Sequence, residues 1–333
     1  MEVDKDKIFR GNMCLQLLFI SAKSLHLLLS FENNLQFTKF KQMPVIKSKS
    51  IYFFLKLLNF KKIVEYYFNN PPRSKKLVYP SSFSRLFHVY EFFILKHAVV
   101  TIQPKIDFCN IHVLYFHGGG YVLEGNSMHW KIVQNIASNT KCRVSYIDYP
   151  LAPDNNYITT FEMVQLAFNK LTTDYPNDVF VFIGDSAGGG LALALAQKLF
   201  LENATIQPVK NILFSPWLDI TMQNPAIRMQ EKLDYILPYN GLKVAGKKYV
   251  GDADPNHYLV SPINGRLDGI GKTLVFYGTQ ELFYPDCVML KEKTAGFGNF
   301  FFEEFEGMQH DWVIFPIPEA NDALNKAMEF MIS

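Results

Sequence analysis

The sequence predicts an α/β fold in which a mostly parallel central sheet carries helices on both faces. From residue 111 onward, short apolar runs rich in β-branched and aromatic residues alternate with longer segments rich in helix formers. This alternation is typical of parallel sheets, because a parallel connection needs a crossover that is usually a helix. Two of the runs end in glycine-rich turns, at residues 117–120 and 184–190. The length of 333 residues, 49% of them hydrophobic, is ample for one large core with insertions.

Net charge and cysteine usage restrict the class of protein. The formal net charge is only +2 and the lysines are scattered, so we expect no nucleic-acid partner. Cys14, Cys109, Cys142 and Cys287 are far apart in sequence and form no C-x-x-C motif, which favours a reducing, cytoplasmic location. Neither H-E-x-x-H nor paired C-x-x-C motifs occur, so we expect no metal and no cofactor. No sequence feature sets the oligomeric state.

Residues 1–42 form an N-terminal extension that admits more than one interpretation. Basic residues precede the apolar residues 13–22, an order that resembles a secretory signal peptide. Lys23 then interrupts the apolar run, which is too short to span a bilayer. The pattern therefore favours an intracellular protein over a secreted one.

Residues 50–68 form a strongly apolar helix candidate with lysines at its edges. Asn69-Asn70-Pro71-Pro72 ends it, because proline cannot continue a helix. Lysines beside phenylalanine and leucine are typical of helices that lie on a membrane surface. Two interpretations stay open: a helix packed on its own domain, and peripheral membrane contact through residues 43–68.

The remaining elements follow in a regular order that is broken once. The stretch from about 217 to 262 is irregular, with several X-Pro pairs and one helical run at 240–249, and it is predicted to be an insertion. The expected strands are one or two within 86–102, then 111–116, 142–147, 178–183, 209–214, 273–277 and 300–305. The expected helices are 127–139, 160–173, 190–200, one starting near Pro285, and 318–332.

The segment Gly184-Asp185-Ser186-Ala187-Gly188 joins a predicted buried strand to a predicted helix. This G-x-S-x-G pattern is that of a nucleophile elbow, in which glycines let the strand and the helix approach closely and the serine sits on a strained turn. The helix that follows directs its N-terminal N–H groups toward an oxyanion formed there. The pattern alone also fits a glycine-rich helix start without catalytic meaning.

A second motif strengthens the catalytic interpretation. The predicted strand 111–116 ends in His117-Gly118-Gly119-Gly120, one strand–helix unit before the serine, where an oxyanion loop is expected. With Tyr149-Pro150-Leu151-Ala152-Pro153 and Gly307-Met308-Gln309-His310, the chain resembles the hormone-sensitive-lipase-like group of α/β-hydrolases over roughly residues 95–332. Ser215-Pro216-Trp217-Leu218-Asp219 and Tyr284-Pro285-Asp286 resemble its bacterial acetyl-esterase branch.

The resemblance implies an α/β-hydrolase fold with a helical cap. Residues 81–216 and 260–333 would form the core, and residues 43–80 and 217–259 the cap. Met43 resembles a start site in the related esterases, so the extension could lie upstream of the natural start.

A serine nucleophile needs a base, and an acid must orient that base. In this fold the acid and then the histidine follow the serine along the chain, which leaves His257 and His310 as candidate bases. His257 lies in the irregular insertion, whereas His310 follows the last predicted strand, so we expect His310 to be the base. The family places its acid three residues after the glycine that follows strand 273–277, a position occupied here by Glu281, with Asp286 as the alternative.

The family pattern places the oxyanion hole at the backbone N–H groups of Gly118, Gly119 and Ala187. His117 is expected to order the loop, and Asp185 to be structural. The resemblance thus predicts a serine carboxylesterase that hydrolyses short-chain acyl, acetyl-type esters of small molecules through an acyl-enzyme. The alternatives are a membrane-surface lipase, amidase or deacetylase of the same fold, and a non-catalytic binding module.

Overall fold

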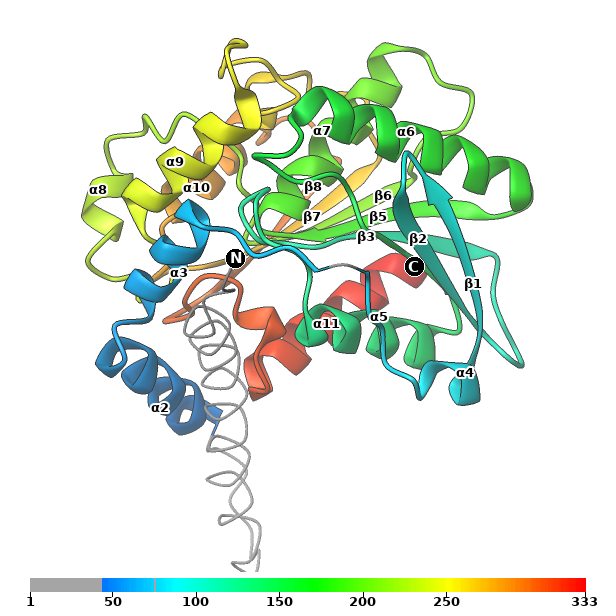
Figure 1. The fold of residues 1–333 in the computed structure, drawn as a ribbon, viewed down its shortest axis with the longest axis horizontal. Helices are drawn as coiled ribbons and strands as arrows, with labels where there is room; N and C mark the ends of the chain where they lie inside the picture. The colour runs from blue at the N-terminus through cyan, green and yellow to red at the C-terminus, as the bar shows by residue number, and fades with distance from the viewer. Residues whose placement is uncertain (1–43, 75) are drawn as a thin grey trace, which may run out of the picture. The chain divides into compact units, whose positions relative to one another are not determined.

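The computed structural model describes residues 44–74 and 76–333, so the predictions for residues 1–42 lie outside the described residues. In the described part, eight strands form one sheet in the order β1-β2-β4-β3-β5-β6-β7-β8 (Figure 1). β2 runs antiparallel to both β1 and β4, and the other pairs are parallel. The strands are β1 Phe87–Ile94, β2 His97–Pro104, β3 Ile111–Phe116, β4 Arg143–Ile147, β5 Val179–Asp185, β6 Lys210–Phe214, β7 Lys272–Gly278 and β8 Phe300–Phe305.

Helices cover both faces of this sheet, which confirms the predicted α/β class. α6 and α7 lie on one face, and α5 and α11 on the other (Figure 1). The strands between them are buried on both sides and therefore read as continuous apolar runs rather than as alternating ones. The helices are α2 Pro44–Leu57, α3 Phe60–Asn69, α4 Phe83–Leu86, α5 Ser127–Thr140, α6 Tyr157–Asp174, α7 Ala187–Leu201, α8 Ile227–Gln230, α9 Tyr239–Val250, α10 Tyr284–Lys293 and α11 Pro318–Ile332.

The single helix expected at residues 50–68 is instead two helices, α2 and α3. The break lies at Asn59, whose φ of 51° is left-handed and cannot continue a right-handed helix. Asparagine tolerates this conformation better than other non-glycine residues do, so Asn59 can form the break between the two helices. A second difference is that α6 begins at Tyr157, three residues earlier than expected, because the side chain of Asn156 caps it by accepting from the N–H groups of Ile158 and Thr159.

Two segments far apart in sequence meet beside the carboxyl ends of the strands. α3 packs against α9, and the Lys248 ammonium donates to the carbonyl oxygens of Phe68 and Asn69, each at 2.9 Å. α3 and the insertion thus lie together, and the assignment of residues 43–80 and 217–259 to one cap stays a prediction.

Two thiols separated in sequence are neighbours in the fold. The sulfur atoms of Cys109 and Cys142 lie 2.9 Å apart, and both cysteines are free.

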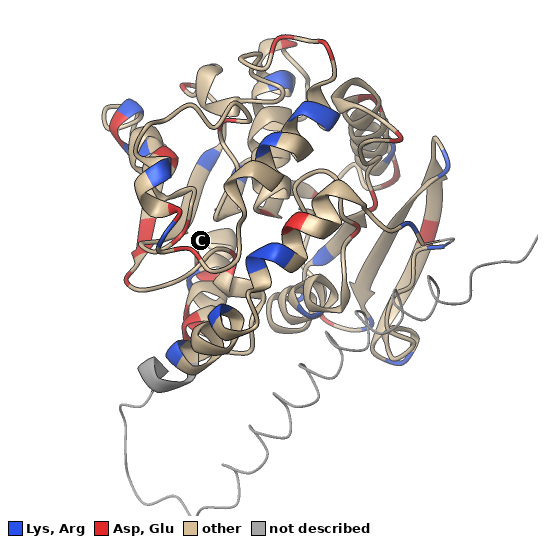
Figure 2. Cartoon of the chain, turned by 60° about the vertical axis from the view of Figure 1, so that its left-hand side comes forward, with Lys and Arg blue, Asp and Glu red and all other residues tan. Residues whose placement is uncertain are grey.

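Residues of both charge signs, Lys and Arg as well as Asp and Glu, are interspersed over the ribbon (Figure 2). Within residues 44–74 and 76–333, none of the helices has the length and apolar character needed to cross a bilayer.

Candidate active site

Ser186 stands at the turn between β5 and α7, on the edge of the sheet where the parallel strands end. Its backbone has φ 52° and ψ −120°, a strained conformation for a residue with a side chain. Close packing maintains this turn: a Cβ on Gly184 would lie 2.3 Å from the carbonyl oxygen of Gly188, and one on Gly188 would lie 2.0 Å from that of Phe116. Only glycine fits at both positions, so strand and helix can approach as a nucleophile elbow requires.

His310 and Glu281 meet Ser186 at this edge. The His310 Nε2 atom lies 2.9 Å from the Ser186 Oγ atom, and its Nδ1 atom lies 2.8 Å from the Glu281 Oε2 atom. The other carboxylate oxygen of Glu281 accepts the N–H of Gly278 at 2.8 Å, which fixes the acid at the end of β7. The three side chains are buried, with relative exposures of 4%, 2% and 0% for Ser186, His310 and Glu281. This is the geometry of a serine nucleophile, an imidazole base and an orienting carboxylate.

The protein surroundings disfavour an unpaired charge on Glu281. Burial raises the pKa of Glu281, although the hydrogen bond with His310 opposes that shift. The carboxylate is therefore most stable beside a positive imidazolium, which forms when His310 takes a proton. A hydrophobic wall completes this environment, because the Phe283 ring meets the His310 ring edge-on at 5.0 Å.

Asp286, the alternative acid, lies elsewhere. Asp286 is in the first turn of α10, and its Oδ1 atom accepts a hydrogen bond from the Asn224 side-chain amide at 2.8 Å. Within the described residues, no contact between Asp286 and His310 is found. Burial raises its pKa from 3.8 to about 7, and the nearby charge of Asp219 adds to the effect. The structure therefore brings Glu281, and not Asp286, to the histidine.

Replacing Asp286 with asparagine is expected to raise the free energy of unfolding, by an amount that grows with pH. Between the unfolded pKa of 3.8 and the folded pKa of about 7, the unfolded chain releases the proton while the folded chain keeps it, so wild-type stability falls as pH rises. From about pH 5 to about pH 8, the advantage of the variant should increase by roughly 2–3 kcal/mol. Urea unfolding at both pH values measures it, and a pH-independent advantage would contradict the assignment.

In the glycine loop after β3, one of the backbone N–H groups expected to form the oxyanion hole is already hydrogen-bonded within the protein. The N–H of Gly118 donates to the Asp185 Oδ2 atom at 2.8 Å, so this amide is engaged inside the protein and is not available to an oxyanion. The prediction of Gly118 as an oxyanion donor is therefore wrong. Gly119 and Gly120 follow with φ of 117° and 63°, and a Cβ on Gly119 would lie 2.6 Å from the carbonyl oxygen of Leu123. Within the described residues, no acceptor is found for the N–H groups of Gly119, Gly120 or Ala187.

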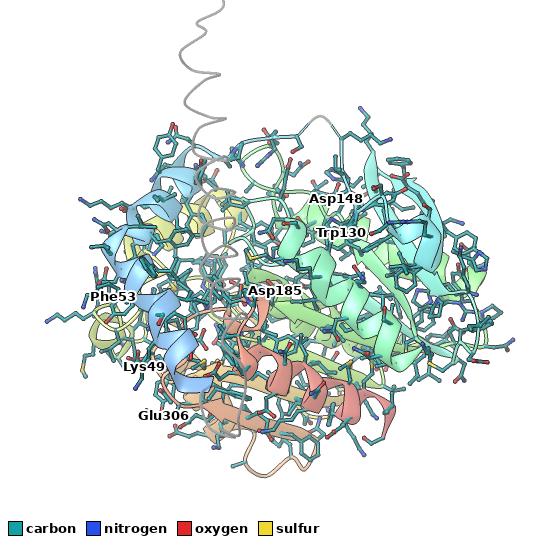
Figure 3. The ribbon with its side chains drawn as sticks, turned by 90° about the horizontal axis from the view of Figure 1, so that it is seen from below. Lys49, Phe53, Trp130, Asp148, Asp185 and Glu306 are labelled. Atoms are coloured by element: carbon teal, nitrogen blue, oxygen red, sulfur yellow. The ribbon has the colours of Figure 1, made fainter. Side chains whose placement is uncertain are left out.

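Asp185 anchors the loop through a buried network. Besides Gly118, its carboxylate accepts from the Tyr115 hydroxyl and lies 3.2 Å from the His129 Nε2 atom. Burial opposes ionisation of Asp185, but His129 and the Tyr115 hydrogen bond outweigh it and lower the pKa of Asp185. Figure 3 shows Asp185 in the interior of the described chain. This carboxylate therefore ties the turn that carries Ser186 to the glycine loop after β3.

His117 orders the loop from the other side. Its Nδ1 atom lies 2.6 Å from the carbonyl oxygen of Gly118, its ring stacks on Tyr149 at 4.4 Å, and the Tyr149 hydroxyl donates to the His117 carbonyl oxygen at 2.6 Å. Burial and the neighbouring His129 lower the pKa of His117 to about 4, so the ring is neutral near pH 7. His257 lies in the insertion, where its ring contacts Tyr258 and Tyr157 instead of the serine.

Two buried acids that the sequence did not single out also lie near Glu281 and His310. Asp234 accepts from the N–H groups of Ile236, Leu237 and Leu282 at 2.7–2.8 Å, and so links the insertion to the loop that carries Glu281. The Asp311 Oδ2 atom lies 3.7 Å from the His310 Nε2 atom. Burial, with the charges of Asp185 and Glu281, raises the pKa of Asp311 well above its usual value.

Across the described residues, no group of three or more His, Cys, Asp or Glu side chains is arranged to hold a metal ion. The described site consists of side chains and backbone amides suited to acyl transfer.

Comparison with known proteins finds relatives that are hydrolases. A family model described as the alpha/beta hydrolase fold matches residues 113–314. An esterase of Acinetobacter venetianus is 32% identical over 227 residues, which are 66% of this chain and 74% of that protein. An acetyl-hydrolase of Streptomyces hygroscopicus is 27% identical over 223 residues, which are 66% of this chain and 74% of that protein. A solved hormone-sensitive lipase from a metagenome library shares the fold, with a TM-score of 0.73 and 21% identity over 88% of this chain and 98% of its own.

Proposed function

Because the chain belongs to the alpha/beta hydrolase family and is a carboxylic ester hydrolase, we propose that Ser186, His310 and Glu281 are its catalytic triad. The observation that carries this proposal is the continuous hydrogen-bonded series from the serine hydroxyl to the imidazole and on to the buried carboxylate, at 2.9 and 2.8 Å. Two motifs of the hormone-sensitive-lipase-like group contribute to this site: GDSAGG contains Ser186, and HGGG forms the glycine loop beside it.

In the proposed reaction, the Ser186 Oγ atom attacks the ester carbonyl carbon while His310 Nε2 takes the hydroxyl proton. The carbonyl oxygen becomes an oxyanion, for which we propose the N–H groups of Gly119, Gly120 and Ala187 as donors. Collapse of this intermediate breaks the bond to the alcohol, which leaves with the proton from His310. Water, deprotonated by His310, then attacks the acyl-enzyme and releases the acid with regeneration of Ser186.

We propose that the acyl group is short, as in an acetyl ester. Bulky aromatic side chains that are almost fully buried lie next to the proposed triad. The backbone N–H of Trp217 donates to the Ser186 carbonyl oxygen at 2.9 Å, the Trp217 ring stacks on Phe283 at 5.8 Å and on Tyr121 at 5.6 Å, and Phe283 contacts His310. Such a wall leaves little room for a long chain beside the attacked carbonyl. The acetyl-hydrolase among the relatives supports the same preference.

A series of p-nitrophenyl esters from acetate to decanoate tests the acyl preference. We expect kcat/KM to be highest for acetate or butyrate and to fall by at least about tenfold at decanoate, since an acyl chain that does not fit the pocket loses transition-state binding. A kcat/KM that rises with chain length would contradict the short-chain proposal and leave the triad proposal standing. The alcohol is the same throughout, so differences report on the acyl site alone.

A further inference from the structure

α2 has an inward and an outward side, and the inward side is packed on the described part of the protein. The inward side carries Ser48, Ile51 and Tyr52, which are at most 5% exposed. The Ser48 hydroxyl donates to Glu319 at 2.8 Å, and the Tyr52 hydroxyl donates to the sulfur of Met308 at 3.3 Å. The first contact holds α2 against the start of α11, and the second holds it against the loop that leads into His310.

The outward side is also apolar. Large hydrophobic side chains from α2 and from the turn after it are exposed to solvent, and Tyr66 of α3 is exposed as well. A helix that is apolar on both sides is normally covered on both. The exposed fractions are 62% for Phe53, 40% for Phe54, 67% for Leu57, 54% for Leu58 and 61% for Tyr66.

Lysines accompany these apolar side chains. Lys49 and Lys56 of α2 and Lys62 of α3 are exposed, and Glu65 is the only acidic residue between positions 44 and 70. Figure 3 shows Lys49 and Phe53 on the outer side of α2, and Figure 2 brings this side of the ribbon forward. We call the surface made of these side chains the α2–α3 outer face: Lys49, Phe53, Phe54, Lys56, Leu57, Leu58, Lys62 and Tyr66.

We propose that the α2–α3 outer face docks on the surface of an anionic lipid bilayer. Helices that lie at a bilayer surface combine phenylalanine and leucine, which enter the acyl boundary, with lysines that meet the anionic headgroups. The cores of protein–protein interfaces are depleted in lysine, so this mixture favours a lipid surface over a protein partner. The charge of the face and the charge of the bilayer are complementary.

The position of the face adds a functional consequence, which rests on the proposed esterase site. α2 touches Met308, two residues before His310. Phe68 lies in the last turn of α3, and its ring would lie 2.9 Å from a Cβ placed on Gly120. The helices that carry the outer face therefore border both the histidine loop and the oxyanion loop. Docking would hold the cap beside the bilayer, where lipid-soluble esters are concentrated.

Co-sedimentation of the full chain with vesicles tests the proposal. We expect binding to phosphatidylcholine vesicles that contain phosphatidylserine, and weaker binding to phosphatidylcholine alone or at high salt. The variant Phe53→Ser/Leu57→Ser should bind at least about tenfold more weakly, because the exposed apolar area is lost. Lys49→Glu/Lys56→Glu should lose the preference for anionic vesicles. The matched control Phe93→Ser/Ile158→Ser changes side chains that are 60% and 59% exposed on other elements and should bind like wild type.

Three results would overturn docking. The first is that wild type does not bind anionic vesicles, and the second is that Phe53→Ser/Leu57→Ser binds them as well as wild type does. The third is that, in sedimentation velocity without lipid, wild type is a dimer and an outer-face variant is a monomer. The last result would assign the face to a second copy of the chain. Hydrolysis of p-nitrophenyl acetate without vesicles should be unchanged in all variants, because none of these residues contacts the triad. Its absence in wild type would count against the esterase site and not against docking.

Discussion

Replacing Ser186 with alanine is expected to lower kcat/KM for p-nitrophenyl acetate by roughly 10⁴–10⁶-fold, as when the nucleophile of other serine hydrolases is removed. The Ser186 Oγ atom is the group that His310 Nε2 reaches, at 2.9 Å, so the variant lacks the atom that would form the acyl-enzyme. Steady-state kinetics measure the loss. The free energy of unfolding should change little, because alanine keeps the Cβ atom and the packing of the turn.

A double-mutant cycle separates this role from a structural one. His310→Ala should cost about as much as Ser186→Ala, and the double variant little more than either, because residues that act as one unit are not additive. Losses that multiply in the double variant would show that Ser186 and His310 act independently. That outcome would contradict the triad.

The second large effect is expected at Glu281. Changing it to glutamine should lower kcat by roughly 10³–10⁴-fold with a smaller effect on KM, because a neutral amide neither stabilises the imidazolium nor fixes its tautomer. The carboxylate reaches His310 Nδ1 at 2.8 Å and is itself held by the N–H of Gly278. The measurement is the pair kcat and KM on one soluble ester.

Asp286→Asn is the matched control for Glu281→Gln. It makes the same chemical change to a buried carboxyl five positions along the chain, one that hydrogen-bonds Asn224 instead of the histidine. We expect its kcat within about twofold of wild type, since substitutions away from the reacting groups change little. A large loss in Asp286→Asn with a small one in Glu281→Gln would reverse the assignment of the acid.

Much of the fold follows from local sequence patterns. The strand expected at 300–305 and the helix expected at 318–332 coincide with β8 and α11, because apolar runs and proline-marked helix starts are short-range signals. The division of the N-terminal helix at Asn59 could not be read in this way. It depends on one residue adopting a left-handed conformation, which most asparagines do not.

The site shows the same division between local and long-range information. The G-x-S-x-G and HGGG motifs place Ser186 and the oxyanion loop, since the chemistry requires glycines at close spacing. The engagement of the Gly118 amide depends on where Asp185 points, 67 residues along the chain, and no spacing rule gives that. The same holds for Asp234 and for the Cys109–Cys142 contact, which arise only when separate strands and loops assemble.

The most direct test of the triad is active-site labelling of the folded wild-type chain with a fluorophosphonate, followed by mass-spectrometric location of the adduct. A nucleophile activated by His310 should react with this probe, whereas ordinary serines should not. We predict one adduct, on Ser186, that is absent from Ser186→Ala and much slower to form in His310→Ala. An intact, folded chain that takes no label, or that carries the adduct on another residue, would contradict the proposed catalytic triad.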